Sequence, residues 1–175
     1  MRILGIDPGS RRTGFGIVDH AKGRTAYVTS GCVRSDGDDF ARRLKEIFDG
    51  IREITRTYRP DAIAIEKVFV KINVDSALKL GQARGAALCA VLMDELPVCE
   101  YSPTQIKQAV VGKGNAAKLQ VQHMVKVLLC LPGAPQADAA DALAVALCHI
   151  NTSTTLARLS PPASGRPGKK VKVYR

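Results

Sequence analysis

Apolar residues near the start of the chain alternate with small and polar ones in the pattern of β-strands. Residues 2–7 follow this pattern as far as Asp7, where Pro8-Gly9 ends it. A carboxylate therefore lies where a strand leaves its sheet. Residues 14–19 and 25–29 have the same character and are separated by a turn. Three short strands in succession predict an antiparallel meander.

From residue 38 onward, helical spacing of apolar residues alternates with short apolar runs. A helix is predicted behind Asp38, ending at Arg59-Pro60, and a buried strand at 61–66 that ends in Glu66. The later predicted elements are a helix capped by Asp75 or Ser76 and running to about Glu95, a strand at 97–101, a short helix at 105–111, a helix capped by Asn115 and a last helix from about 137 to 150. This order predicts an α/β domain.

The predicted helix at 76–94 has small residues around much of its circumference, including Gly81, Ala83, Gly85 and Ala87. Small residues let another backbone approach closely. Two neighbours fit this pattern: another part of the same core, or the same helix of a second subunit. The sequence leaves both open.

Length and composition indicate one compact domain. The chain has 175 residues, of which 46% are hydrophobic, and this suffices for a single core. No stretch approaches the roughly 20 uninterrupted apolar residues of a membrane span, and the first residues lead into a strand pattern instead of a signal peptide. We therefore expect a soluble, cytoplasmic protein with no membrane partner.

The charge is strongly positive and unevenly distributed. A formal net charge of +10 suggests a polyanionic partner. The segment from Arg158 onward carries six of the 26 basic residues among many Pro, Ser and Gly residues, a composition typical of disorder. We therefore expect a folded domain at 1–152 and a basic, disordered tail at 153–175.

Two carboxylates mark the last predicted helix. Asp138 and Asp141 are three residues apart, so they share a helix face with roughly 5–6 Å between their Cβ atoms. Acids in a first helical turn also cap the helix and complement its dipole, which accounts for one of them well and the other in part.

Together with Asp7 and Glu66, this pair favours a metal site. Two acids at strand ends and two on a helix lying across those strands bring four negative charges together, and they cannot all remain ionised without a cation. Carboxylate oxygens suit Mg²⁺ or Mn²⁺. Two such ions about 4 Å apart would support an in-line phosphoryl displacement by water.

Several blocks of the sequence resemble one known family. GIDPGSRRTGFGIVD, then IEKVF and NVDSALKLGQARGAA, then VVGKGNAAKLQVQHMV and PQADAADALAVA are similar to the RuvC family of bacterial Holliday-junction endonucleases. The resemblance runs in order from residue 3 to about 150. It implies an RNase H-like fold with a five-stranded mixed sheet flanked by helices, working as a homodimer.

The resemblance also implies an activity and its residues. Asp7, Glu66, Asp138 and Asp141 match the family's catalytic, metal-binding carboxylates. The implied reaction is a pair of symmetric nicks in a four-way DNA junction during recombination and repair. The implied partners are the junction DNA and the RuvA and RuvB branch-migration motor.

Four residues are candidates for DNA binding. Lys107 and Lys118 match family lysines that contact the DNA backbone near the scissile phosphate. Lys113 lies with them in the stretch from Tyr101 to Ala137, which contains no acid, although such charges also occur on ordinary solvated helix faces. Phe69 follows the strand that ends near Lys67, where the family's Phe wedges against unpaired bases at the junction centre.

Two other readings remain open at this stage. A catalytically silent module would bind junction DNA through its basic residues without cutting it. An ATP-handling protein of the actin and sugar-kinase type opens with a similar strand and meander, but it needs two such lobes to enclose a nucleotide. Four intact acids argue against the first reading, and the chain length argues against the second.

Overall fold

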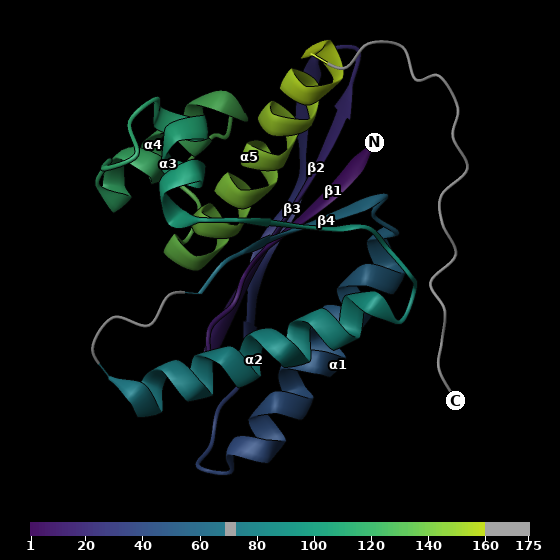
Figure 1. Ribbon diagram of the computed structural model, residues 1–175, viewed down its shortest axis with the longest axis vertical. Helices are drawn as coiled ribbons and strands as arrows, with labels where there is room; N and C mark the ends of the chain where they lie inside the picture. Colours follow the sequence, from purple (N-terminus) through teal and green to yellow (C-terminus); the bar gives the residue numbers. More distant parts are fainter. Residues whose placement is uncertain (69–72, 160–175) are drawn as a thin grey trace.

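The computed structural model describes residues 1–68 and 73–159. In this part of the chain five strands form one sheet with the order β3-β2-β1-β4-β5, and five helices cover it (Figure 1). The elements are β1 (Arg2–Asp7), β2 (Arg12–Ala21), β3 (Arg24–Arg34), α1 (Phe40–Tyr58), β4 (Ala62–Glu66), α2 (Val74–Leu92), β5 (Val98–Tyr101), α3 (Pro103–Val111), α4 (Lys118–Leu128) and α5 (Ala137–Leu159). The predicted α/β architecture is confirmed.

The sheet is mixed. The strands β1, β2 and β3 form the predicted antiparallel meander, in which Asp7 pairs with Gly14. On its other edge β1 pairs in parallel with β4, where Ile6 lies opposite Ile65, and β4 pairs in parallel with β5. The carboxyl ends of β1 and β4 therefore lie side by side at one edge of the sheet.

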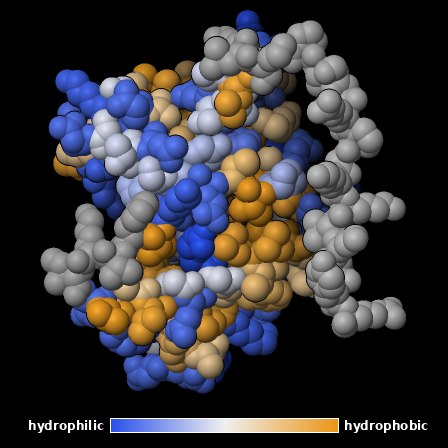
Figure 2. Space-filling model, in the orientation of Figure 1, coloured by the Kyte–Doolittle hydropathy of each residue, from blue (hydrophilic) through white to orange (hydrophobic). Residues whose placement is uncertain are grey.

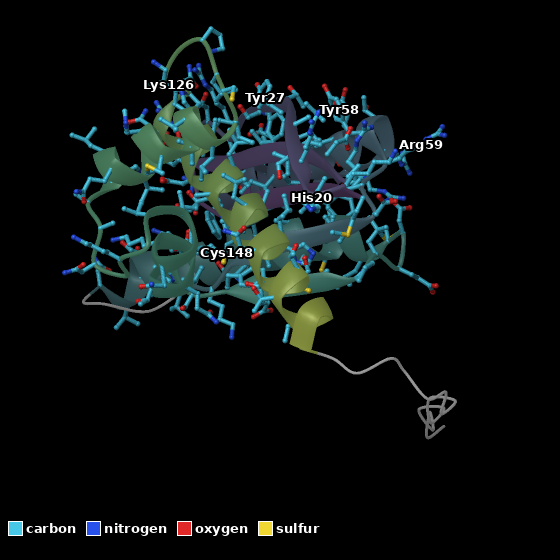
Figure 3. All side chains as sticks on the ribbon, turned by 90° about the horizontal axis from the view of Figure 1, so that it is seen from above. His20, Tyr27, Tyr58, Arg59, Lys126 and Cys148 are labelled. Atoms are coloured by element: carbon cyan, nitrogen blue, oxygen red, sulfur yellow. The ribbon has the colours of Figure 1, made fainter. Side chains whose placement is uncertain are left out.

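Helices pack on both faces of this sheet, with α1 and α2 on one side and α3, α4 and α5 on the other (Figure 1). Figure 3, a view from above, shows Cys148 of α5 inside the molecule and Lys126 and Arg59 toward its edges. Because both faces are covered, the central strands β1 and β4 read as nearly continuous apolar runs.

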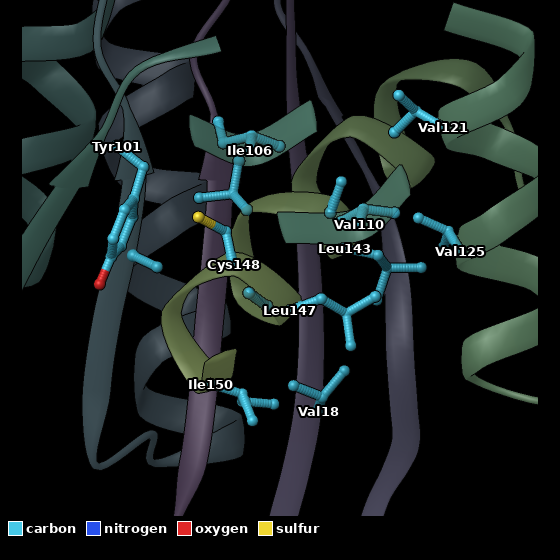
Figure 4. Packing of buried hydrophobic residues seen from close by; sticks show 14 of the residues in the cluster. Val18, Tyr101, Ile106, Val110, Val121, Val125, Leu143, Leu147, Cys148 and Ile150 are labelled. Atoms are coloured by element: carbon cyan, nitrogen blue, oxygen red, sulfur yellow. The ribbon is translucent and has the colours of Figure 1, made fainter. Parts of the chain in front are cut away.

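Each face of the sheet has its own hydrophobic core. We call the cluster shown in Figure 4 the α5-side core, because its strand residues pack against α3, α4 and α5. The α1-side core joins the opposite strand faces to α1 and α2. The α5-side core includes Ile3, Val18, Ala64, Val121, Val125, Leu143 and Leu147. The α1-side core includes Leu4, Ile6, Ile47, Ile51, Ile63, Ile65 and Ala87.

The helix α5 lies directly on the backbone of β1 and β2, because glycines face it there. A Cβ atom at Gly5 would lie 2.1 Å from the carbonyl oxygen of Ala142, and one at Gly14 would lie 2.1 Å from that of Asp138. Both distances are far below van der Waals contact. Side chains at these two positions would therefore push α5 away from the sheet.

The small residues of α2 serve the core on one side only. Ala83, Ala87 and Ala90 are fully buried in the α1-side core. Gly81 and Gly85 face open space, with no heavy atom within 4 Å of a Cβ placed on either. The core interpretation is thus confirmed for one face of α2, and at Gly81 and Gly85 no other part of the described chain packs against the helix.

Two predicted helix starts are wrong. The N-cap of α2 is Asn73, whose side chain accepts a hydrogen bond from the Ser76 amide, in place of Asp75 or Ser76. The helix α4 starts at Lys118 after Ala117 instead of after Asn115, and the Gln120 side chain accepts from the Ala117 amide. In α4, a hydrogen bond from the Ala117 amide to the Gln120 side chain replaces the expected Asn115 cap. Preferences for single N-cap residues do not reveal such a bond.

The last helix is also longer than predicted, since α5 continues to Leu159 and crosses the expected boundary at residue 152. Its polar extension is tied back to the helix: Thr155 Oγ1 donates to the Asn151 carbonyl over 2.7 Å. The Asn151 amide group donates to the Ala109 carbonyl of α3 over 2.9 Å. The tail expected from residue 153 otherwise lies largely at 160–175, outside the described residues. No helix in the described chain is long and apolar enough to cross a membrane.

The close contact of α5 with β1 predicts a specific sensitivity. Gly5→Ala should lower the free energy of unfolding by about 1–3 kcal/mol, because the added methyl group would overlap backbone atoms of α5. Gly133→Ala is the matched control, since a Cβ there meets nothing within 4 Å, and its effect should stay within about 0.5 kcal/mol. Urea unfolding measures both. Equal effects of the two substitutions would contradict the proposed contact.

Candidate active site

Three of the four predicted carboxylates line one cavity of about 300 Å³. It opens at the carboxyl ends of β1 and β4, between the sheet and the helices α3, α4 and α5. Its lining residues are Asp7, Glu66, Pro103, Ile106, Lys107, Lys118, Val121, Asp141 and Ala144. The cavity therefore combines three acids and two lysines with an apolar wall.

Strand alternation places Asp7 and Glu66 together. In β1, Leu4 and Ile6 belong to the α1-side core, so Asp7 points to the opposite face, toward α5. In β4, Ile63 and Ile65 also belong to the α1-side core, which turns Glu66 toward α5 as well. Because the two strands are adjacent and parallel, both acids emerge at the same place.

The third acid comes from the helix above them. Asp141 lies in α5 one residue before Ala142, whose carbonyl oxygen approaches Gly5 of β1. The close packing of α5 on this strand thus brings the Asp141 carboxylate to the strand ends. Its side chain is 23% exposed, so it is largely shielded from water.

Burial and like charges perturb the two strand acids. Burial is the main cause that raises the pKa of Asp7 to about 8, and the charges of Glu66 and Asp141 add to it. Burial and then Asp141 also raise the pKa of Glu66. Both shifts mean that this cavity disfavours additional negative charge and favours a proton or another cation.

Lys118 supplies a positive charge to the cavity. Its ammonium nitrogen lies 2.6 Å from Asp141 Oδ2, and this hydrogen bond is the main cause that raises the pKa of Lys118. Lys107 lines the same cavity, and its charge opposes the rise in the pKa of Glu66. The site is therefore a group of acids with cationic side chains at its rim.

The fourth predicted acid, Asp138, lies on α5 but does not line the cavity. Its Oδ2 is 3.9 Å from Nη1 of Arg12, at the start of β2. The prediction from sequence missed Arg12. The sequence places the basic pair Arg11-Arg12 in the turn after Asp7, close to the predicted acids, and this position could have indicated Arg12.

The donor set suits a hard divalent cation. Carboxylate oxygens from β1, β4 and α5 are the ligands that Mg²⁺ and Mn²⁺ prefer, and the raised pKa values of Asp7 and Glu66 are consistent with a site that gains from added positive charge. As the described side chains lie, no group of three or more His, Cys, Asp or Glu residues has the spacing of a formed metal site.

Two predicted DNA-binding residues fall elsewhere. Lys113 is exposed in the loop between α3 and α4 and does not line the cavity. Phe69 lies outside the described residues. Both therefore stay predictions.

Most of the folded region matches one protein family. The family model for Crossover junction endodeoxyribonuclease RuvC matches residues 3–149. The chain belongs to the RuvC family. A relative with that name from Shewanella oneidensis is 60% identical over 164 residues, covering 94% of this chain and 95% of the relative. Another, from Shewanella piezotolerans, is 58% identical over the same shares of both chains.

Solved structures agree with this assignment. Thermus thermophilus RuvC in complex with a Holliday junction substrate matches with a TM-score of 0.83 and 35% identity, covering 89% of this chain and 96% of that chain. The yeast mitochondrial Holliday junction resolvase matches with a TM-score of 0.65 at 12% identity, covering 89% and 82% of the two chains, which supports the fold alone. The fold is thus the RNase H-like fold of RuvC, as the sequence predicted.

The raised pKa of Asp7 predicts how stability varies with pH in the absence of metal. Because this pKa is 3.8 in an ordinary Asp and about 8 here, the folded protein holds a proton that the unfolded chain has lost. Stability should therefore fall as pH rises from about 4 to about 8. Asp7→Asn should remove this loss and stabilise the metal-free protein at pH 8 by about 1–3 kcal/mol.

Chemical unfolding at pH 6 and pH 8 with a chelator measures this effect. Asp49→Asn, at an exposed carboxylate of α1, is the control and should leave the pH dependence unchanged. An Asp7→Asn variant that is less stable than the parent at pH 8 would contradict the assigned pKa.

Proposed function

We propose that this protein is a structure-selective endonuclease that resolves four-way DNA junctions by metal-dependent hydrolysis of phosphodiester bonds. One observation carries the proposal: Asp7, Glu66 and Asp141 line a single cavity in a chain of the RuvC family. Two symmetric nicks in strands of like polarity would leave ends with 3′-hydroxyl and 5′-phosphate groups that a ligase can join.

The family implies a divalent metal, and we propose Mg²⁺, with Mn²⁺ as a substitute. Asp7, Glu66 and Asp141 would hold it, and Asp138 would join them by turning away from Arg12. When bound, two such ions supply an activated water molecule and stabilise the leaving oxygen of an in-line displacement. The carboxylates keep the reacting groups in place, and the apolar wall of Ile106, Val121 and Ala144 limits access of bulk water.

Two lysines would position the DNA. Lys107 and Lys118 lie in the cavity wall, where their ammonium groups can bind phosphate oxygens on either side of the cleaved bond. Lys113 extends this basic surface along the loop between α3 and α4. Figure 2 shows mainly hydrophilic residues over α3 and α4. We propose Phe69 as the side chain that contacts unpaired bases at the junction centre.

A homodimer would provide the two cuts. A four-way junction has approximate twofold symmetry, so paired nicks need two active sites related by a twofold axis. The open face of α2 suits such an interface: Val74, Leu78 and Leu92 are 68%, 63% and 52% exposed, and Gly81 and Gly85 between them leave room for a second backbone. Figure 2 shows hydrophobic residues on the surface in the region of α2.

Cellular context follows from the family. We propose that the enzyme acts in the cytoplasm on junctions that the RuvA and RuvB motor moves along DNA. A protein that bound junction DNA without cutting it would show no cleavage in the assay below. A kinase-like, ATP-handling function has no support in a chain of the RuvC family.

Asp7→Asn should abolish junction cleavage while leaving junction binding within about twofold of the parent. The reason is that Asn keeps the shape of Asp but lacks the negative charge that holds the metal. Cleavage of a mobile synthetic four-way junction and of a linear duplex, each with and without Mg²⁺, measures activity, and electrophoretic mobility shift measures binding. Asp49→Asn serves as the control with the same change in charge. Cleavage by Asp7→Asn at the parental rate would contradict the proposed site, and joint loss of binding and cleavage would make Asp7 structural.

Leu78→Glu should convert a dimer to a monomer, because it places a charge in the apolar stripe of α2. Light scattering after size-exclusion chromatography measures the mass. Val127→Glu is the control, since Val127 is 51% exposed on α4, on the opposite side of the sheet. A Leu78→Glu variant that remains dimeric, or a parent that is monomeric, would contradict the proposed interface.

A further inference from the structure

Lys118 makes a contact that phosphate binding alone does not require. It is the first residue of α4, and its side chain is 60% exposed. Its ammonium group nevertheless lies 2.6 Å from Asp141 Oδ2, whose side chain is only 23% exposed. A long lysine in solvent loses conformational entropy when it adopts one position. The negative charge of the cavity favours the position in which Lys118 contacts Asp141.

The other positive groups near the site do not make an equivalent contact. Lys107 lines the same cavity but forms no ion pair within 4.0 Å to an acid of the described residues. The Arg12 side chain is 66% exposed and lies 3.9 Å from Asp138. Asp138 is the acid of α5 that does not line the cavity. Lys118 is thus the cation placed directly on a carboxylate of the cavity.

A divalent ion held by the cavity carboxylates would compete with Lys118 for the negative charge of Asp141. The Lys118 ammonium group lies 2.6 Å from Asp141 Oδ2, so an ion held by Asp141 would bring a second positive charge close to it. The two cations are also alike in charge and would repel each other at such a separation. Binding of a divalent ion would therefore weaken the ion pair between Lys118 and Asp141.

We propose that Lys118 is an internal counter-ion that occupies Asp141 in the metal-free protein and is displaced by the incoming divalent ion. This inference rests on the proposed metal site. Lys118 neutralises part of the acidic cavity until metal binds, and its displacement lowers the apparent metal affinity by the strength of the ion pair. Once released, the ammonium group remains tethered at the start of α4, beside the cavity, and becomes free to contact a DNA phosphate. The exchange thereby couples metal binding to availability of the DNA-binding lysine.

Replacing Lys118 should therefore tighten metal binding. Lys118→Met keeps the length of the side chain and removes its charge, so Mn²⁺ should bind roughly three- to tenfold more tightly. Lys107→Met removes the same charge from the same cavity but breaks no ion pair, so it reports the general electrostatic effect. The gain for Lys118→Met should exceed that for Lys107→Met.

Isothermal titration calorimetry of Mn²⁺ into the chelator-treated, full-length protein measures these affinities without any cleavage. Lys118→Gln is measured beside Lys118→Met, and circular dichroism verifies that each variant is folded. In an Asp141→Asn background, adding Lys118→Met should give no more gain than adding Lys107→Met, because the ion pair is already absent. This cycle isolates the contact between the two side chains.

The outcomes separate the inference from the function on which it rests. Equal or smaller gains for both Lys118 variants than for Lys107→Met would overturn the counter-ion role and leave the metal site intact. If the parent protein bound no Mn²⁺ and its junction cleavage were independent of divalent ions, the proposed function would fail and the inference with it. A larger gain for the Lys118 variants that disappears with Asp141→Asn is the result that the inference predicts.

Discussion

The direct contact between α5 and the backbone of β1 and β2 determines the geometry of this protein. Gly5 and Gly14 present no side chain to the helix, so carbonyl groups of α5 lie against the strands. A helix packed at this short range cannot shift or rotate without steric overlap. The position of Asp141 relative to Asp7 is therefore set by packing inside the domain and not by a loop, which suits the proposed metal site.

The same packing creates an electrostatic conflict between buried acids that a bound cation would relieve. Three acids share one cavity, and burial raises the pKa of Asp7 to about 8. This arrangement lowers the stability of the metal-free fold at neutral and higher pH. Such an unfavourable group of charges is what the proposed binding of a divalent cation would stabilise.

Much of this was predictable from sequence, and the exceptions have physical causes. The strands, the turn after Asp7 and the acid that ends β4 follow from alternation and from Pro-Gly signals. Because alternation also determines which face a residue occupies, the approach of Asp7 and Glu66 was foreseeable. The pairing of Asp138 with Arg12 was not, since it depends on how two distant elements meet. The starts of α2 and α4 depend on side-chain hydrogen bonds that composition does not reveal.

A crystal of the protein soaked in Mn²⁺ and measured for anomalous scattering would test the central claim most directly, because the signal locates the ion without reference to activity. The account predicts an anomalous peak in the cavity at the ends of β1 and β4, within coordination distance of Asp7, Glu66 and Asp141, with the Lys118 ammonium group moved off Asp141. A peak bound elsewhere, with the cavity unchanged and Lys118 still on Asp141, would contradict it.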